Sequence, residues 1–554
     1  MAINRTITGV RKAEVTAENY SYPLLIRQLL HSVLSTDRDQ EIVYRDRVRL
    51  TYAQWHQRLK RLANALTGLG VAPGETVAML DWDSHRYLEA YFAVPMMGAV
   101  LQTVNVRLTP EEIRYTLDHA NAEIVIFHRD FLPLIERLRV VLPKVKAFVL
   151  IAEDGAPEVE WSAGEYEQLL GDASPEYDFP EFDENAIATT FYTTGTTGLP
   201  KAVSFTHRQL VLHTVTLMGA LANLGNTRSF TRNDVYMPLT PMFHVHAWGV
   251  PYLAVLLGIK QVYPGRYDPL TILKLGKAEG VSFSHCVPTI LQMLLHVEGG
   301  AAIEVKDWKL IIGGAALPAA LCKAGLDRGF DVCSGYGMSE TAPFLTITRW
   351  SDALQPSPAE ELDIRCRTGL PAPLVELRVV DENMQDVPPD GRSVGEIIVR
   401  TPWLTSAYRG DPDASAQLWR GGYLHTQDVA TIDAKGYVQV RDRLKDVIKS
   451  GGEWISSLRL EDYISRHPGV MEAAVIAISD ELWGERPLAV LVPRAGWENK
   501  LTLQAISEHL ESFVSADLLP RMALPKRVEE VAALDRSSVG KVDKKALRAR
   551  YAQK

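Results

Sequence analysis

The chain has 554 residues, which predicts two or more domains because domains usually span about 100 to 200 residues. Hydrophobic residues make up 46% of the chain, as in globular proteins. Basic and acidic residues are interspersed and the formal net charge is −9 at pH 7, which argues against non-specific binding to nucleic acid or anionic membranes. A phosphate-bearing substrate therefore needs a local basic site.

The start of the chain, MAINRTITGVRKAE, lacks the apolar core of a signal peptide. No apolar run approaches the roughly 18 residues that a membrane-spanning helix needs, so we expect a cytoplasmic protein without a transmembrane segment. The cysteines are widely spaced, with no CxxC pair and no histidine at zinc-ligand spacing. We expect buried, reduced thiols at Cys286, Cys322, Cys333 and Cys366.

An amphipathic helix is the first predicted element. In residues 51–70, Trp55, Leu59, Leu62 and Leu66 recur at helical spacing, and the segment ends at glycine. The sequences TVAML, AEIVIF and KAFVLI are typical of buried strands, and LKLGKAEGVSFSHCVP indicates a helix, a glycine turn and a strand. Strands separated by helices of about ten or more residues predict an α/β fold with largely parallel sheets.

The composition changes after about residue 440, where a smaller unit is predicted. The segments EAAVIAIS and RPLAVLVPR have the pattern of strands, and LTLQAISEHLESFV has that of a helix. The end of the chain, GKVDKKALRARY, indicates a basic helix. Together they predict a small α+β domain.

Residues 193–201, TTGTTGLPK, indicate a phosphate-binding loop. Backbone N–H groups freed by glycine and a row of hydroxyls can surround phosphate oxygens, and Lys201 adds a positive charge. The spacing is not that of a Walker A loop, because only Leu199 and Pro200 separate Gly198 from Lys201 and no Ser or Thr follows the lysine. Taken alone, the stretch could also be a polar surface loop.

Further motifs follow in order: WKLIIGGAALP, FDVCSGYGMSETAP, GYLHTQDVA, VRDRLKDVIKSGGEWIS and SSVGKVDKKALR. With the loop at 193–201, this ordered set resembles the AMP-forming adenylating superfamily, which contains acyl-CoA synthetases, firefly-type luciferases and the adenylation domains of peptide synthetases. The resemblance covers nearly the whole chain. The segments PMFHVHAWGVPY and DRLKDVIKSGGEWIS are most similar to medium- and long-chain fatty acyl-CoA synthetases.

The resemblance implies a large N-terminal domain of layered sheets and helices and a small mobile α+β C-terminal domain. We expect residues 1–442 to hold the ATP and acyl sites, residues 443–446 to form a hinge, and residues 447–554 to carry the catalytic lysine. Lys445 matches the family's pivot. Rotation there would replace the loop of Lys541 at the site by the Gly451-Gly452 face and open a path for the CoA thiol; otherwise, the hinge segment is a solvated charged turn.

The family's chemistry explains these residue types. A carboxylate becomes a good acyl donor when it attacks the α-phosphorus of ATP, which releases pyrophosphate and forms an acyl-adenylate. Because this step brings an anion to a polyanion, the site must supply positive charge and hydrogen-bond donors. CoA then attacks the carbonyl with its own thiol, which fits the absence of a recognisable Ser-His-Asp or Cys-His nucleophile motif in the sequence.

By resemblance, Glu340 holds Mg²⁺, Thr341 reaches the α-phosphate, and Lys541 bridges the α-phosphate and the acyl carboxylate. An aspartate suits the ribose because a carboxylate accepts hydrogen bonds from two hydroxyls, although Asp428 taken alone could cap a helix or lie on the surface. The β- and γ-phosphates are assigned to Thr193, Thr194, Gly195, Thr196, Thr197, Gly198 and Lys201. Adenine and ribose are assigned to Gly314, Ala315, Ala316, Tyr336, Asp428 and Arg443.

The acyl pocket is assigned to His244 and Trp248, where a tryptophan gates the fatty-acid tunnel of related enzymes. Trp248 could equally be an ordinary core residue, and we expect His246 and His285 to be structural. The hinge and the CoA-facing side are assigned to Lys445, Lys449, Gly451, Gly452 and Trp454.

Two positions depart from the family pattern. Ala202 follows Lys201 where glycine is usual, and a methyl group fits there only if the backbone φ is negative. Asp535 stands in the position of a proline in LDRSSVGK, which changes how the loop of Lys541 is ordered. Neither departure removes a charged or ligand group.

The sequence thus predicts an acid:CoA ligase that uses ATP, Mg²⁺ and CoA, with a medium- to long-chain fatty acid as substrate. Other apolar acids (cyclic, aryl or thioether) are the alternative. A stand-alone adenylation enzyme that loads a carrier protein, and a non-catalytic nucleotide-binding protein, are the rival functions. The family suggests a homodimer, and we expect no nucleic-acid partner.

Overall fold

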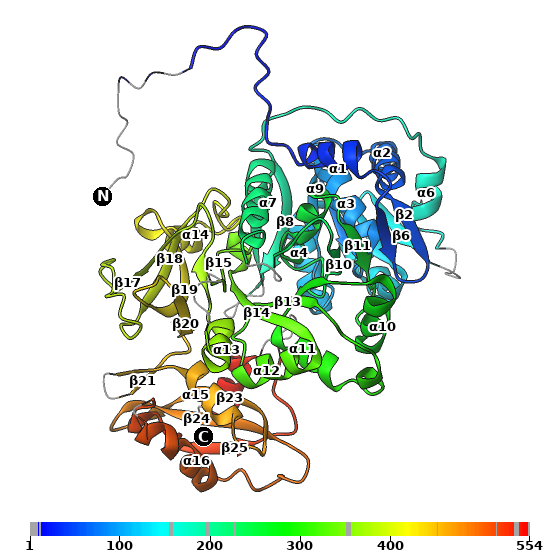
Figure 1. Ribbon diagram of the computed structural model, residues 1–554. Coiled ribbons are helices and arrows are strands. Elements are labelled where there is room, and N and C mark those ends of the chain that lie inside the picture. Colours follow the sequence, from blue (N-terminus) through cyan, green and yellow to red (C-terminus); the bar gives the residue numbers. More distant parts are fainter. Residues whose placement is uncertain are drawn as a thin grey trace.

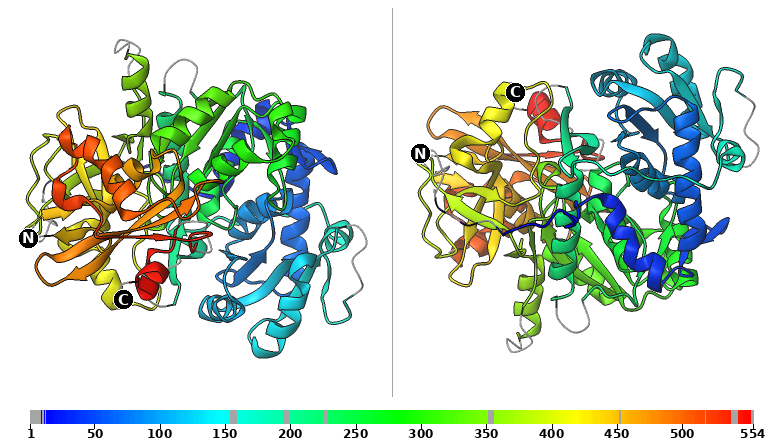
Figure 2. Two further views of the ribbon diagram at one scale, coloured as in Figure 1. Left: turned by 90° about the horizontal axis from the view of Figure 1, so that it is seen from below. Right: turned by 90° about the horizontal axis from the view of Figure 1, so that it is seen from above.

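The computed structural model shows a large body and a smaller one, formed by the C-terminal part of the chain, that lies below it in Figure 1. Figure 2 shows that this smaller body sits on the side opposite the blue and cyan N-terminal part. The described residues are 9, 11, 13–153, 159–193, 199–224, 229–350, 356–450, 453–516, 518–536 and 542–551, except the side chains of 453 and 454.

Two mainly parallel sheets form most of the large body, which confirms the predicted α/β class. Helices connect the parallel strands, because a parallel pair needs a long crossover. One sheet has the order β7 (Gly164–Glu165), β6 (Ala147–Ile151), β5 (Ala122–His128), β3 (Thr76–Leu80), β4 (Val100–Thr103), β8 (Ile187–Thr193) and β9 (Lys201–Thr206). The other has the order β16 (Leu370–Pro371), β15 (Thr346–Ile347), β14 (Phe330–Tyr336), β13 (Trp308–Ile312), β12 (Phe283–Cys286), β10 (Val235–Tyr236), β11 (Lys260–Tyr263), β1 (Glu41–Tyr44) and β2 (Val48–Thr51).

A third, antiparallel sheet completes the large body. It ends at the strand that leads into the predicted hinge, so it places the hinge beside the large body. Its strands are β17 (Glu376–Val380), β18 (Gly395–Arg400), β19 (Leu424–Ile432) and β20 (Val438–Arg443).

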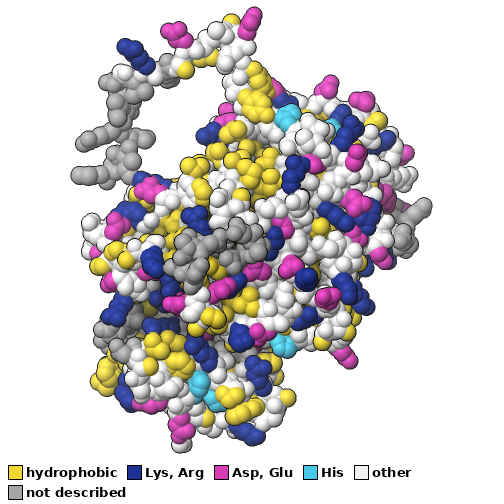
Figure 3. All heavy atoms as spheres, in the orientation of Figure 1, with side chains coloured by type: hydrophobic (Ala, Val, Ile, Leu, Met, Phe, Trp, Pro, Cys, Tyr) yellow, Lys and Arg dark blue, Asp and Glu magenta, His cyan; other side chains and the backbone are white. Residues whose placement is uncertain are grey.

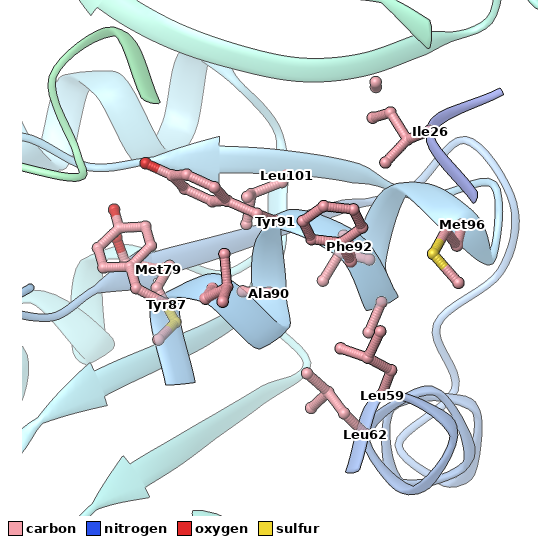
Figure 4. Close-up of a cluster of buried hydrophobic side chains, with 14 of the residues drawn as sticks. Ile26, Leu59, Leu62, Met79, Tyr87, Ala90, Tyr91, Phe92, Met96 and Leu101 are labelled. Carbon is pink, nitrogen blue, oxygen red and sulfur yellow. The ribbon is translucent and has the colours of Figure 1, made fainter. Parts of the chain in front are cut away.

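The predicted first helix is α2 (Tyr52–Gly68). Thr51 caps it in a capping box with Gln54, and the apolar positions named above are buried. Figure 4 shows Leu59 and Leu62 of this helix near α3 (His85–Met96), every residue of which is buried. The core that contains α2 and α3 also includes Phe191 of β8 and Val203 of β9, so it fixes the two strands that hold Thr193 and Lys201.

The other helices of the large body cover the sheets or flank the site. They are α1 (Leu30–Thr36), α4 (Pro110–His119), α5 (Leu132–Leu138), α6 (Tyr166–Asp172), α7 (His207–Leu221), α8 (Val245–Trp248), α9 (Val250–Leu256), α10 (Pro269–Glu279), α11 (Pro288–His296), α12 (Ala319–Arg328), α13 (Pro358–Cys366) and α14 (Pro412–Leu418).

The C-terminal part is an α+β unit with its own hydrophobic core, as its composition predicted. The predicted strands, the predicted helix and the basic final helix are all present. Its strands are β21 (Ile448–Ser450), β22 (Glu453–Ile455), β23 (Val470–Asp480), β24 (Gly484–Pro493) and β25 (Arg527–Glu530), and its helices are α15 (Ser457–Ser465), α16 (Leu503–Ser515) and α17 (Lys544–Tyr551).

Two predictions about the whole chain can be compared with the fold. Among the described residues, no helix combines the length and apolar character needed to cross a membrane. All cysteines are free; Cys286, Cys322 and Cys333 are buried as predicted, whereas Cys366 is only half-buried. Figure 3 shows basic and acidic side chains interspersed over one face, in line with the charge pattern of the sequence.

Candidate active site

A cavity of about 1820 Å³ extends between the large body and the C-terminal domain. It opens where β12, β13 and β14 end, which is the edge of a parallel sheet where ligands usually bind. Residues of β19, β20 and α15 close it from the other side. Most described residues that the sequence assigned to the site line this cavity: Thr193, Lys201, His244, Trp248, Gly314, Ala315, Ala316, Tyr336, Glu340, Asp428, Arg443 and Lys445.

Several predicted residues lie elsewhere or are not described. Thr341 and Lys449 are described but do not line the cavity. Only the backbone of Trp454, in β22, is described. The residues that lie outside the described part of the chain are Thr194, Gly195, Thr196, Thr197, Gly198, Gly451, Gly452 and Lys541.

Asp428, Arg443 and Tyr336 form one polar cluster. Asp428 and Arg443 are direct partners in the antiparallel pair β19–β20, and Arg443 Nε lies 2.7 Å from Asp428 Oδ1. The hydroxyl of Tyr336 donates to Asp428 Oδ2 at 2.6 Å. The carboxylate raises the pKa of Arg443, and burial together with Asp428 raises that of Tyr336. The carboxylate, with 3% exposed area, is thus fixed in orientation to accept hydrogen bonds from a ligand.

A second polar cluster joins Glu340 to Lys201 through Tyr408. The hydroxyl of Tyr408 donates to Glu340 Oε1 at 2.6 Å. Lys201 Nζ lies 4.7 Å from the centre of the Tyr408 ring and 3.8 Å from Asp411 Oδ2. Burial and the neighbouring Glu340 raise the pKa of Tyr408, which keeps its phenol protonated. Tyr408 lies in no motif quoted from the sequence, so only the fold reveals it.

Thr341 and Ser339 differ in where their side chains lie. Thr341 is fully buried, and its hydroxyl donates to the carbonyl of Pro343 at 2.7 Å and accepts from the N–H of Met338. Ser339 lines the cavity instead. The motif SET contains both hydroxyls, and only the turn at residues 339–341 distinguishes them, so the geometry favours Ser339 for a contact with a phosphate.

The aromatic ring of Trp248 stacks on the buried His285, with ring centres 4.8 Å apart and 27° between planes. Nε2 of His285 lies 2.8 Å from the hydroxyl of Tyr236, and Nδ1 lies 3.1 Å from Thr240 Oγ1. Burial lowers the pKa of His285 to about 3, so the ring is neutral. His285, which the sequence assigned a structural role only, thus both lines the cavity and supports Trp248.

The segment that carries Trp248 has an unusual backbone. Residues 245–248 have φ between 46° and 58°, so Val245, His246, Ala247 and Trp248 form a left-handed turn. This conformation costs about 1–2 kcal/mol for each residue that is not glycine. Such strain persists where the surrounding packing fixes it, often at functional sites.

Apolar side chains surround Trp248 on the cavity wall. They come from α7, α9, β13 and the segment after residue 343, and they pack in one hydrophobic cluster. The members that also line the cavity are Leu217, Leu221, Val250, Ile311 and Phe344. None of these side chains is charged, so this part of the cavity suits an apolar group.

The predicted hinge segment, residues 443–446, lies at the cavity. Lys445 lines the cavity, and burial lowers its pKa. Asp442, at the end of the third sheet, accepts a hydrogen bond of 2.6 Å from the N–H of Ser457 in α15. Leu534 and Val542, on either side of the undescribed Lys541, also line the cavity.

The two departures from the family pattern are accommodated locally. Ala202 lies in β9 and is not among the residues with positive φ, so its methyl group causes no backbone strain. The methyl group packs in a small cluster with Tyr192. Asp535 Oδ2 lies 3.0 Å from Arg550 Nη2, which ties the segment before Lys541 to α17.

Known proteins match this chain over nearly all of these elements. The model of the family described as AMP-binding enzyme matches residues 31–409, and that of its C-terminal domain matches residues 459–541. A long-chain-fatty-acid–CoA ligase of Thermus thermophilus is 43% identical over 507 residues, which are 91% of this chain and 90% of that protein. A medium-chain-fatty-acid–CoA ligase of Ectopseudomonas oleovorans is 38% identical over 501 residues, or 89% of each. The solved structure of an anthranilate CoA ligase with anthranoyl-AMP shares the fold, with a TM-score of 0.83 over 96% of this chain and 98% of that one at 23% identity.

Proposed function

The chain belongs to the family of AMP-binding enzymes, and from this premise we propose that it is an acyl-CoA ligase. It joins a carboxylic acid to CoA through an acyl-adenylate, with ATP converted to AMP and pyrophosphate. The observation that carries the proposal is one cavity that unites the Asp428 cluster, the Glu340–Tyr408–Lys201 cluster and an apolar wall. These suit the ribose and phosphates of ATP and the apolar chain of an acid.

In the first step, the enzyme positions the acid against the α-phosphate. Asp428 accepts from the ribose hydroxyls, Lys201 and Ser339 contact phosphate oxygens, and Lys541 neutralises charge at the reacting centre. A magnesium ion fits Glu340, because this carboxylate lines the cavity and Mg²⁺ usually takes one or two carboxylates plus substrate phosphates. The ion would offset phosphate charge when bound.

In the second step, the thiol of CoA attacks the carbonyl of the adenylate and AMP leaves. A rotation of the C-terminal domain at residues 443–446 moves the Lys541 segment away from the reacting carbonyl. Lys445 of these residues lines the cavity, as this proposal requires. The thiol needs no nucleophile from the protein, since it forms the new bond itself.

We further propose a medium- to long-chain fatty acid as substrate, because the cavity wall around Trp248 is apolar and the two relatives named above are fatty-acid ligases. The test measures pyrophosphate release by the purified protein with straight-chain, branched, cyclic, aryl and sulfur-containing acids. Straight chains should give the highest kcat/KM. A higher kcat/KM for another class of acid would assign that class as the substrate and leave the proposed ligase function in place. If no acid caused pyrophosphate release, the proposed ligase function would be refuted.

A carrier-loading enzyme would perform the same first step. Supplying either CoA or a phosphopantetheinylated carrier protein after adenylation separates the two functions. We expect the acyl group on CoA; transfer to the carrier alone would assign the chain to the other function.

A further inference from the structure

The segment that carries Lys541 is bounded by residues that contact the rest of the protein. Arg536 and Val542 pair as an antiparallel bridge, and both line the cavity. The described residues on both sides of 537–541 therefore lie at the cavity wall.

Arg536 connects this segment to both domains. Its Nη2 lies 2.7 and 2.8 Å from the two carboxylate oxygens of Glu472 in β23, within the C-terminal domain. Its Nη1 donates to Oγ1 of Thr289 at 3.2 Å, in the first turn of α11 of the large body. A guanidinium can make both contacts because its N–H groups point in several fixed directions.

Lys544, on the other side of the segment, behaves differently. Its Nζ lies 2.7 Å from Glu461 Oε1 and 2.5 Å from Ser457 Oγ, both in α15. These partners belong to the C-terminal domain, so a rotation at the hinge leaves them in place. The same rotation separates Arg536 from Thr289.

We propose that Arg536 is a positioning residue for adenylate formation. It docks the C-terminal domain onto α11 in the present orientation and releases α11 when that domain rotates. Glu472 holds the guanidinium in place, and the hydroxyl of Thr289 accepts its hydrogen bond on the large body. The inference rests on the proposed function, because only a two-step reaction requires two orientations.

The test measures the two half-reactions separately in the full chain: acid-dependent pyrophosphate release, and CoA-dependent consumption of a presynthesised acyl-adenylate. Arg536→Gln should slow the first by about 10-fold, the scale of one lost charged hydrogen bond, and change the second by less than about 2-fold. Thr289→Val keeps the shape of the side chain but removes the hydroxyl, and should slow the first step less. The variant with both substitutions should be no slower in the first half-reaction than Arg536→Gln, because both substitutions break the same contact between Arg536 and Thr289.

Arg521→Gln is the matched control, since it removes the same charge from the C-terminal domain at an exposed ion pair with Glu511. It should alter neither half-reaction. A wild-type protein without acid-dependent pyrophosphate release would overturn the proposed function and this inference with it. An active wild type whose Arg536→Gln variant loses both half-reactions equally, or neither, would overturn the inference alone.

Discussion

Asp428 and Arg443 face each other across β19 and β20, with 2.7 Å between Oδ1 and Nε. Arg443 is followed directly by Leu444 and Lys445, so the strand that carries one side of the Asp428 cluster continues into the predicted hinge. A single short stretch of backbone therefore joins the Asp428 cluster to the predicted hinge.

Replacing Asp428 by Asn should weaken ATP binding. The amide cannot accept from two ribose hydroxyls as a carboxylate does, and Arg443 loses its charged partner. We expect KM for ATP to rise about 10-fold, as for the loss of one charged hydrogen bond, with KM for the acid changed by less than about 3-fold. Steady-state kinetics with each substrate varied checks this; an equal rise in both KM values would contradict it.

Replacing Tyr408 by Phe removes the hydrogen bond to Glu340 but keeps the ring beneath Lys201. Pyrophosphate release should fall by about 10-fold, because Glu340 is then less well oriented. Glu340→Gln removes the charge itself and should cost about 100-fold. A magnesium titration distinguishes the two, since only Glu340→Gln should need much more Mg²⁺; a normal titration for that variant would argue against Glu340 as the ligand.

Replacing Trp248 by Ala should broaden the acyl specificity. The indole packs against the hydrophobic cluster that contains Ile311 and Phe344 and stacks on His285, so its removal leaves room for bulkier acids. The ratio of kcat/KM for a branched over a straight-chain acid should rise about 10-fold, the scale of a few methylene groups. KM for ATP serves as the internal control, and an unchanged ratio would show that Trp248 is only a core residue.

Lys541→Ala should slow adenylate formation by about 100-fold or more, because one charge-stabilising group is lost. A presynthesised acyl-adenylate should still react with CoA at nearly the wild-type rate. Comparing the two half-reactions of this variant tests the two-orientation mechanism, which an equal loss in both would exclude.

The carboxyl group of Asp83 should make the free energy of unfolding fall as the pH rises. Burial raises its pKa to about 7, although its Oδ1 accepts a hydrogen bond of 2.7 Å from the N–H of Met242. The unfolded chain releases this proton near pH 4, so the folded state binds it more tightly, and its stabilising effect is lost progressively between about pH 4 and 7. The whole effect is about 4 kcal/mol. Thermal unfolding at pH 5 and pH 8 should show a smaller pH difference in Asp83→Asn than in the wild type; the same difference in both would contradict it.

Much of the fold could be predicted because its signals are local. The spacing of Trp55, Leu59, Leu62 and Leu66 suffices to predict α2, and alternation of short apolar strands with helices suffices to predict parallel sheets. The ordered motifs also pointed to Glu340 and Asp428 through their resemblance to the family, which does not depend on where the chain places these residues.

Other parts of the site depend on which segments meet in space. Tyr408 contributes through one hydroxyl in a segment without a motif, and His285 through a ring beneath Trp248. Whether Ser339 or Thr341 faces the cavity depends on the turn that holds them. By itself, the sequence determined the residue types, the order of motifs and the secondary structure, because these follow from short-range patterns. The tertiary structure alone decided that Tyr408, His285 and Ser339 line one cavity, because contacts between distant segments depend on how the sheets and the C-terminal domain pack.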